Sequence, residues 1–81
     1  MRESKIEKTV NEYAESRGFL VYKFVSPGHS GVPDKLFISP TGVVFFIEFK
    51  QADKKPKPNQ VREIGYLYDN NAHVFVVDNV N

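Results

Sequence analysis

The segment that decides the fold is "DKLFISPTGVVFFIEFK", residues 34–50. Two apolar runs, 35–38 and 43–50, are rich in the β-branched and aromatic residues typical of strands. Between them lies "SPTG" (39–42), in which Pro40 suits the second position of a turn. The segment therefore predicts a hairpin of two antiparallel strands.

The second predicted strand ends with two charged residues in an otherwise apolar run. Side chains two positions apart share one face of a strand, so Glu48 and Lys50 lie on one face while Phe45, Ile47 and Phe49 lie on the other. Burying a charge is costly unless the charge is paired or bound to a metal. A cross-strand salt bridge on a solvated face is the ordinary explanation, and a chemical site is the alternative.

A third charge, Asp34, stands at the start of the first hairpin strand, where antiparallel pairing can bring it close to Glu48. Taken alone, an Asp after a proline indicates an Asx turn. Two nearby carboxylates repel each other unless they are protonated or bridged by a cation. Mg²⁺ typically takes one or two carboxylates, several waters and substrate phosphate oxygens. Lys50 would then stand where negative charge builds on a phosphate.

The rest of the chain predicts two helices and two further strands. An apolar stripe predicts a first helix over residues 4–17, which Gly18 ends. The other expected elements are a strand at 19–25, an irregular loop at 26–34, a helix at 60–68 capped by Asn59, and a strand at 73–78. The order αβββαβ indicates an α/β (α+β layered) fold with a mixed sheet flanked by helices.

Length and composition indicate one folded domain spanning residues 1–81. With 41% hydrophobic residues the chain is too apolar to be disordered. The absence of cysteine excludes disulfides, thiolate zinc sites and a cysteine nucleophile, and it is compatible with the cytoplasm. The charged first residues show no signal peptide, and no apolar run is long enough to span a membrane.

Basic residues gather after the hairpin, with five Lys or Arg and one Asp between residues 50 and 62. Such a cluster indicates an anionic partner, although a solvated loop is an equally good explanation of so short a run. The loop at 26–34 adds hydroxyl and imidazole donors. The candidates for binding a DNA backbone are Ser26, His29, Ser30, Lys54, Lys55, Lys57 and Arg62.

The string "GVPDKLFISPTGVVFFIEFKQADKKPKPNQ" (31–60), together with "IEKTV" (6–10) and "KFVSPGHSGVPD" (23–34), resembles a known family. It is similar to the PD-(D/E)XK nuclease superfamily, specifically the stand-alone VRR-NUC domains of phages and bacteria. PD…(D/E)xK alone is a loose pattern, whereas the flanking strands and the downstream Gln make this match more specific. The resemblance implies a small restriction-endonuclease-like core.

The resemblance also implies a role for each matching residue. Asp34 and Glu48 would be metal ligands, Phe49 would lend its backbone carbonyl to the metal, and Lys50 would be the catalytic lysine. Gln60, near the start of the second helix, matches the family's helix-borne Gln beside the site. A plain solvent-exposed helix residue is the alternative for Gln60.

The superfamily often adds an acid from the first helix. Glu7 fits the family register better, and Glu3, one helical turn away, is the alternative. Glu7 also has a structural explanation, because Ser4 and Glu7 have the spacing of a capping box.

The family resemblance implies a Mg²⁺- or Mn²⁺-dependent, structure-selective DNA endonuclease that resolves Holliday junctions as a homodimer. Its partners would be branched DNA and a second copy of the chain, with no membrane. It would act in the cytoplasm, that of a bacterial host if the gene is phage-encoded. The alternatives are a non-catalytic nucleic-acid-binding module of the same fold, and a nuclease with nicking or flap specificity.

Overall fold

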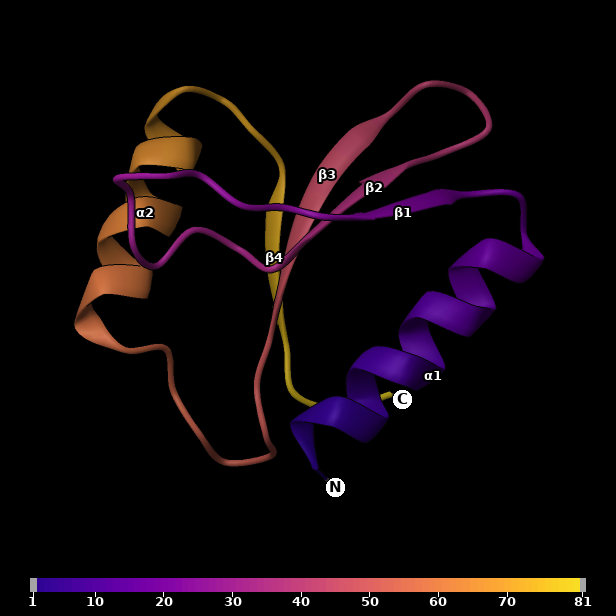
Figure 1. Ribbon diagram of the computed structural model, residues 1–81, viewed down its shortest axis with the longest axis horizontal. Helices are drawn as coiled ribbons and strands as arrows, with labels where there is room; N and C mark the ends of the chain where they lie inside the picture. The colour runs from indigo at the N-terminus through magenta and orange to yellow at the C-terminus, as the bar shows by residue number, and fades with distance from the viewer. Residues whose placement is uncertain (1, 81) are drawn as a thin grey trace.

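The computed structural model describes residues 2–80, which form two helices and four strands in the order αβββαβ (Figure 1). The elements are α1 (Glu3–Ser16), β1 (Leu20–Lys23), β2 (Lys35–Ile38), β3 (Val44–Phe49), α2 (Pro58–Asp69) and β4 (Val74–Val77). The strands form one sheet in the order β1-β2-β3-β4. β1 pairs with β2 and β2 with β3 in antiparallel fashion, whereas β4 is parallel to β3, so the predicted mixed α+β sheet is confirmed.

The predicted hairpin is formed by β2 and β3, with Lys35 opposite Ile47 and Ile38 opposite Val44. Its turn is closed by the Ser39 hydroxyl, which accepts a hydrogen bond from the Val43 backbone N–H at 2.9 Å. Gly42 has φ +87°, a conformation that glycine adopts without steric cost. The turn therefore sets the register that places every later side chain of β3 on its face of the sheet.

Helix α2 is the crossover that returns the chain to the sheet for β4. A parallel neighbour requires such a connection, because a tight turn can join only antiparallel strands. The Phe46 N–H donates to the His73 carbonyl at 2.8 Å, and the Lys50 N–H donates to the Val77 carbonyl at 2.9 Å. These bonds tie the ends of β3 to β4. A hydrogen bond from Gln60 to Glu48 shows that the first turn of α2 lies beside the end of β3 (Figure 1).

The main core lies between α1 and one face of the sheet. Ile6 and Ala14 of α1 pack against Phe37, Ile47 and Phe49, all of them buried. The face predicted for the apolar side chains of β3 is thereby confirmed. Each fully buried Ile or Phe contributes about 1.5–3 kcal/mol, so α1 is held by its apolar stripe.

Helix α2 begins earlier than expected. Pro58 is its first residue and Lys57 its N-cap, so the prediction of Asn59 as the cap is wrong. Proline is well suited to the first helical position, where its missing N–H has no intrahelical partner to lose. The Gln60 side-chain oxygen accepts the Lys57 backbone N–H at 2.8 Å and supplies the cap from inside the helix.

Two other expectations near the chain start are also wrong. α1 begins at Glu3, with Arg2 as N-cap and no side-chain cap, so the Ser4–Glu7 capping box is not formed. β1 ends at Lys23 and not at residue 25. Beyond it the Phe24 N–H still donates to the Asp34 carbonyl at 2.7 Å, but the next position in this register faces Pro33, which has no N–H to continue the ladder.

Candidate functional site

Three carboxylates from three parts of the chain meet at one end of the sheet. Glu3, Asp34 and Glu48 each place a carboxylate oxygen within 4.8 Å of the others. Asp34 is one position beyond the Lys35–Ile47 pair, which puts it opposite Glu48 across the hairpin. The predicted proximity of Asp34 and Glu48 is confirmed, and the first turn of α1 brings Glu3 to the same place.

Glu48 is the buried member of this acidic cluster. It is 1% exposed, and its Oε1 atom is buried without a hydrogen-bond partner. Loss of solvation raises the pKa of Glu48 to about 7, and the negative charges of Asp34, Glu3 and Glu7 act in the same direction, against the opposing effect of Lys50. The fold therefore pushes this carboxylate toward its neutral form when only protein groups surround it.

The other oxygen of Glu48 is held by two side chains. Oε2 accepts a hydrogen bond from Gln60 Nε2 at 3.2 Å and lies 3.8 Å from Lys50 Nζ. The Glu48 and Lys50 side chains are 2% and 10% exposed, so a salt bridge on a solvated face does not describe them. Gln60 is half-buried and faces Glu48, which excludes the solvent-exposed alternative for this residue.

The residues present fit a divalent cation. A buried, unpartnered carboxylate oxygen costs free energy, and the repulsion among three carboxylates adds to that cost. Hard cations such as Mg²⁺ take carboxylate oxygens and remove both penalties. Phe49 is fully buried and ends β3, and a metal-ligand role for its carbonyl stays a prediction.

Between the two candidate acids of α1, the geometry favours Glu3. Glu7 is half-buried and lines a cavity of about 480 Å³ together with Glu3, Asp34 and Gln51, but it lies outside the cluster of three carboxylates. The preference for Glu7 depends on family register alone. Glu3 is the first residue of α1, so it is the N-terminal end of this helix that lies beside Asp34 and Glu48.

Five of the seven predicted DNA-binding residues fall into two groups, and the other two, Ser26 and Ser30, lie in the loop between β1 and β2. Lys54, Lys55 and Lys57 are exposed on the connection from β3 to α2. His29 and Arg62 instead contact a common carboxylate, Glu63, with His29 Nδ1 3.6 Å from Glu63 Oε1 and Arg62 Nε 3.3 Å from Glu63 Oε2.

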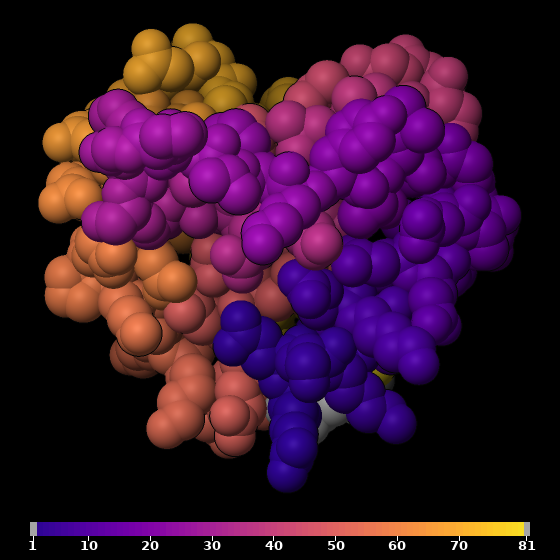
Figure 2. Space-filling view, viewed as in Figure 1, coloured from indigo at the N-terminus to yellow at the C-terminus, as the bar shows by residue number. Residues whose placement is uncertain are grey.

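Sequence reasoning missed Glu63, which is only 7% exposed. Its position beside Ile64 on the apolar side of α2 is a weak signal of burial, and the contact with His29 depends on how the loop folds back. Figure 2 shows the segment at residues 24–34, in magenta, lying over the orange surface of α2. Glu63 therefore links the loop that leads to Asp34 with the helix that presents Gln60.

Among residues 2–80, no helix combines the length and the apolar character needed to cross a lipid bilayer.

Comparison with known proteins identifies relatives of this chain. No family model matches. A curated relative, "Putative nuclease p44" of Acyrthosiphon pisum secondary endosymbiont phage 1, is 42% identical over 78 residues, which cover 96% of this chain and 84% of the relative. A solved structure described as a VRR_NUC domain superposes with a TM-score of 0.87 at 42% identity and covers 94% of this chain and 83% of that one. The chain therefore belongs to the VRR-NUC family of nucleases, with the restriction-endonuclease-like fold of that family.

Proposed function

We propose that the protein is a Mg²⁺- or Mn²⁺-dependent endonuclease that hydrolyses phosphodiester bonds in DNA. The observation that supports this most directly is the buried, unpartnered Oε1 of Glu48, in a carboxylate that forms a cluster with those of Asp34 and Glu3 and whose other oxygen lies 3.8 Å from the Lys50 ammonium. A fold that only needed stability would not leave this oxygen without a partner.

The metal would be held by Glu48 Oε1, Asp34 and Glu3, with the Phe49 carbonyl as a further ligand. Bound there, it would polarise a phosphate oxygen and lower the pKa of a coordinated water. Gln60 fixes the orientation of the Glu48 carboxylate by donating to Oε2, which leaves Oε1 available to a metal. Lys50 contributes a positive charge close to Glu48, where negative charge develops on the phosphate during cleavage.

The alternative of a non-catalytic binding module fits this geometry less well. Carboxylates repel phosphates, so an acidic cluster next to a DNA strand opposes binding unless a cation lies between them. The exposed lysines after β3 would be sufficient for simple binding. They are better explained as contacts to the phosphates that flank the cleaved bond.

Branched DNA cut by a homodimer is the proposed substrate and assembly. α1 and α2 are separated by three strands and form no helix-turn-helix, and the chain has no cysteine for a zinc finger. Selection by shape is thus favoured over selection by base sequence. A homodimer with two-fold symmetry presents two equivalent sites at a fixed spacing, which suits paired cuts in a four-way junction.

Exposed aromatic side chains of α2 are the proposed pairing surface. Tyr66 and Tyr68 are 55% and 54% exposed, but they point to different sides of the helix, and the Tyr68 hydroxyl donates to the Val74 carbonyl at 2.8 Å, so Tyr66 is the better candidate. The alternative surface on the hairpin is wrong, because Phe37 is fully buried and Phe45 is half-buried, stacked on Phe37 with ring centroids 5.2 Å apart. Cleavage with nicking or flap specificity would need only one site and is the second candidate activity.

The decisive experiment is cleavage of a labelled four-way junction and of a linear duplex of matched sequence, with Mg²⁺, Mn²⁺ or EDTA. We expect metal-dependent cutting of the junction, none in EDTA, and a dimeric mass in solution. Failure to cut either substrate with either metal contradicts the nuclease proposal. Equal cutting of both substrates contradicts only the preference for junctions.

A further inference from the structure

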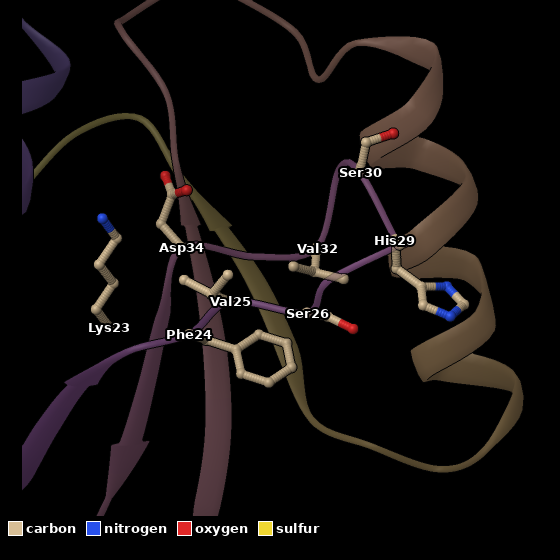
Figure 3. A pocket seen from close by; sticks show the side chains of 9 residues that line it. Lys23, Phe24, Val25, Ser26, His29, Ser30, Val32 and Asp34 are labelled. Atoms are coloured by element: carbon tan, nitrogen blue, oxygen red, sulfur yellow. The ribbon is translucent and has the colours of Figure 1, made fainter.

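The loop between β1 and β2 forms a cavity of about 600 Å³ beside the acidic cluster (Figure 3). Lys23 and Asp34 stand at one end of it, the side chains of Val25 and Val32 lie in the middle, and Ser30 lies at the far end. The cavity is therefore apolar in its middle and polar at both ends, and Asp34, at one end, is a proposed metal ligand.

This cavity is held open by fixed contacts. The Phe24 N–H donates to the Asp34 carbonyl at 2.7 Å and closes the base of the loop. At the tip, Gly31 lies so close to α2 that a Cβ placed on it would be 2.5 Å from the Asn59 carbonyl oxygen. The His29 ring points toward α2, where it contacts the buried Glu63, and not toward Asp34. A loop fastened at its base and tip presents a preformed but open hollow beside the acidic cluster.

We propose that this cavity binds one unpaired nucleotide of the DNA, adjoining the phosphate cut at the acidic cluster. This proposal rests on the proposed function, which makes DNA the substrate, and adds that the substrate contains an unpaired nucleotide. The valine side chains would contact the base or sugar, and the Ser30 hydroxyl would hydrogen-bond to the polar edge. The exposed Lys23 ammonium would neutralise the phosphate next to Asp34.

The size of the cavity favours an unpaired nucleotide. Its volume lies in the usual range for sites that take a drug-sized molecule, roughly 300–1,000 Å³, and it is open to solvent, so a single nucleotide that leaves the stack can enter it. Branch points and nicks supply nucleotides that are free to leave the stack, and extruding such a nucleotide costs less free energy than breaking a pair. The cavity thus provides a physical reason for selecting DNA by structure.

The test fills the cavity without disturbing the core. Val25 lines the cavity and is 65% exposed, so Val25→Trp adds bulk there without displacing buried side chains. Val43→Trp is the matched control, since Val43 is 51% exposed at the hairpin turn and does not line the cavity. Binding is measured in Ca²⁺ with two labelled duplexes, one fully paired and one containing a single-nucleotide bulge.

We expect wild type to bind the bulged duplex more tightly, and Val25→Trp to raise its Kd about tenfold, which corresponds to about 1.4 kcal/mol of binding free energy. The Kd of the paired duplex should change less than twofold, and Val43→Trp should change neither. The rise in melting temperature on adding Mn²⁺ should be the same in all three proteins, which shows that the acidic cluster is intact.

Two results would overturn the cavity proposal: a Val25→Trp protein that binds the bulged duplex as wild type does, or one that loses affinity for both duplexes equally. The nuclease proposal fails separately, if wild type cuts no DNA with Mg²⁺ or Mn²⁺. A selective loss of bulge binding in such an inactive protein would still support the nucleotide subsite.

Discussion

Replacing Glu48 with glutamine should stabilise the metal-free protein at alkaline pH. The substituted side chain would have nearly the shape of the native one and would still accept the hydrogen bond from Gln60. Glu48→Gln removes a buried negative charge whose Oε1 has no partner and which faces Asp34 and Glu3. The substitution therefore isolates the free-energy cost of ionising Glu48 inside the fold.

The size of the effect follows from the pKa of Glu48, which burial and neighbouring carboxylates raise from 4.5 to about 7. Between these two values the native state binds more protons than the unfolded state, so stability falls as pH rises through this window. At roughly 1.4 kcal/mol per pH unit, full ionisation of Glu48 costs the native state about 3 kcal/mol. We expect Glu48→Gln to recover most of this above pH 7 and almost none below pH 4.5.

The measurement is urea unfolding of wild type and Glu48→Gln in EDTA at pH 4.5 and pH 8. The difference in unfolding free energy between the two proteins should increase by about 3 kcal/mol from the lower to the higher pH, because every other titrating group is common to both. Glu12→Gln, on the exposed surface of α1, is the control and should show no such change. Mn²⁺ should raise the melting temperature of wild type at pH 8 but not that of Glu48→Gln.

A result in which Glu48→Gln is no more stable than wild type at pH 8 in EDTA would refute this reasoning. It would mean that ionising Glu48 costs the folded protein no free energy. The unpartnered oxygen of Glu48 would then be no argument for a bound cation. An equal gain at both pH values would also contradict it, since that gain would come from packing or hydrogen bonding and not from charge.

Gly31→Ala should destabilise the protein by more than about 2 kcal/mol in urea unfolding, because its Cβ would meet the backbone of α2. Gly28→Ala is the control: Gly28 has a similar positive φ but open space around it, so this substitution should cost only about 1–2 kcal/mol. Equal losses in the two variants would contradict the clash. Lys50→Met should lower kcat about 10²–10³-fold while the melting-temperature rise with Mn²⁺ persists, and unchanged cleavage would exclude a catalytic role for this ammonium. The connection from β3 to α2 carries three exposed lysines, Lys54, Lys55 and Lys57. Replacing all three by alanine should reduce the slope of log Kd against log salt concentration by about 0.9 for each phosphate that is no longer neutralised. An unchanged slope would mean that DNA binds elsewhere on the protein.

Much of this fold was predictable from local patterns. The hairpin followed from two apolar runs around a Pro- and Gly-containing turn, and the proximity of Asp34 and Glu48 followed from the antiparallel register. The bounds of α2 were not predictable in the same way. Pro58 disfavours a helix interior, yet proline at the first helical position favours a helix start, and local sequence does not distinguish the two.

The sequence by itself determined the chemistry of the site, because residue type and a two-residue strand period place Glu48 and Lys50 on one face and the aromatic residues on the other. Only the tertiary structure decided which acid of α1 joins them, since that depends on where the helix end meets the sheet and not on spacing. It also decided that Glu48 loses its water and keeps one oxygen without a partner. Burial depends on packing among segments that are distant in the sequence, so no local sequence pattern can predict it.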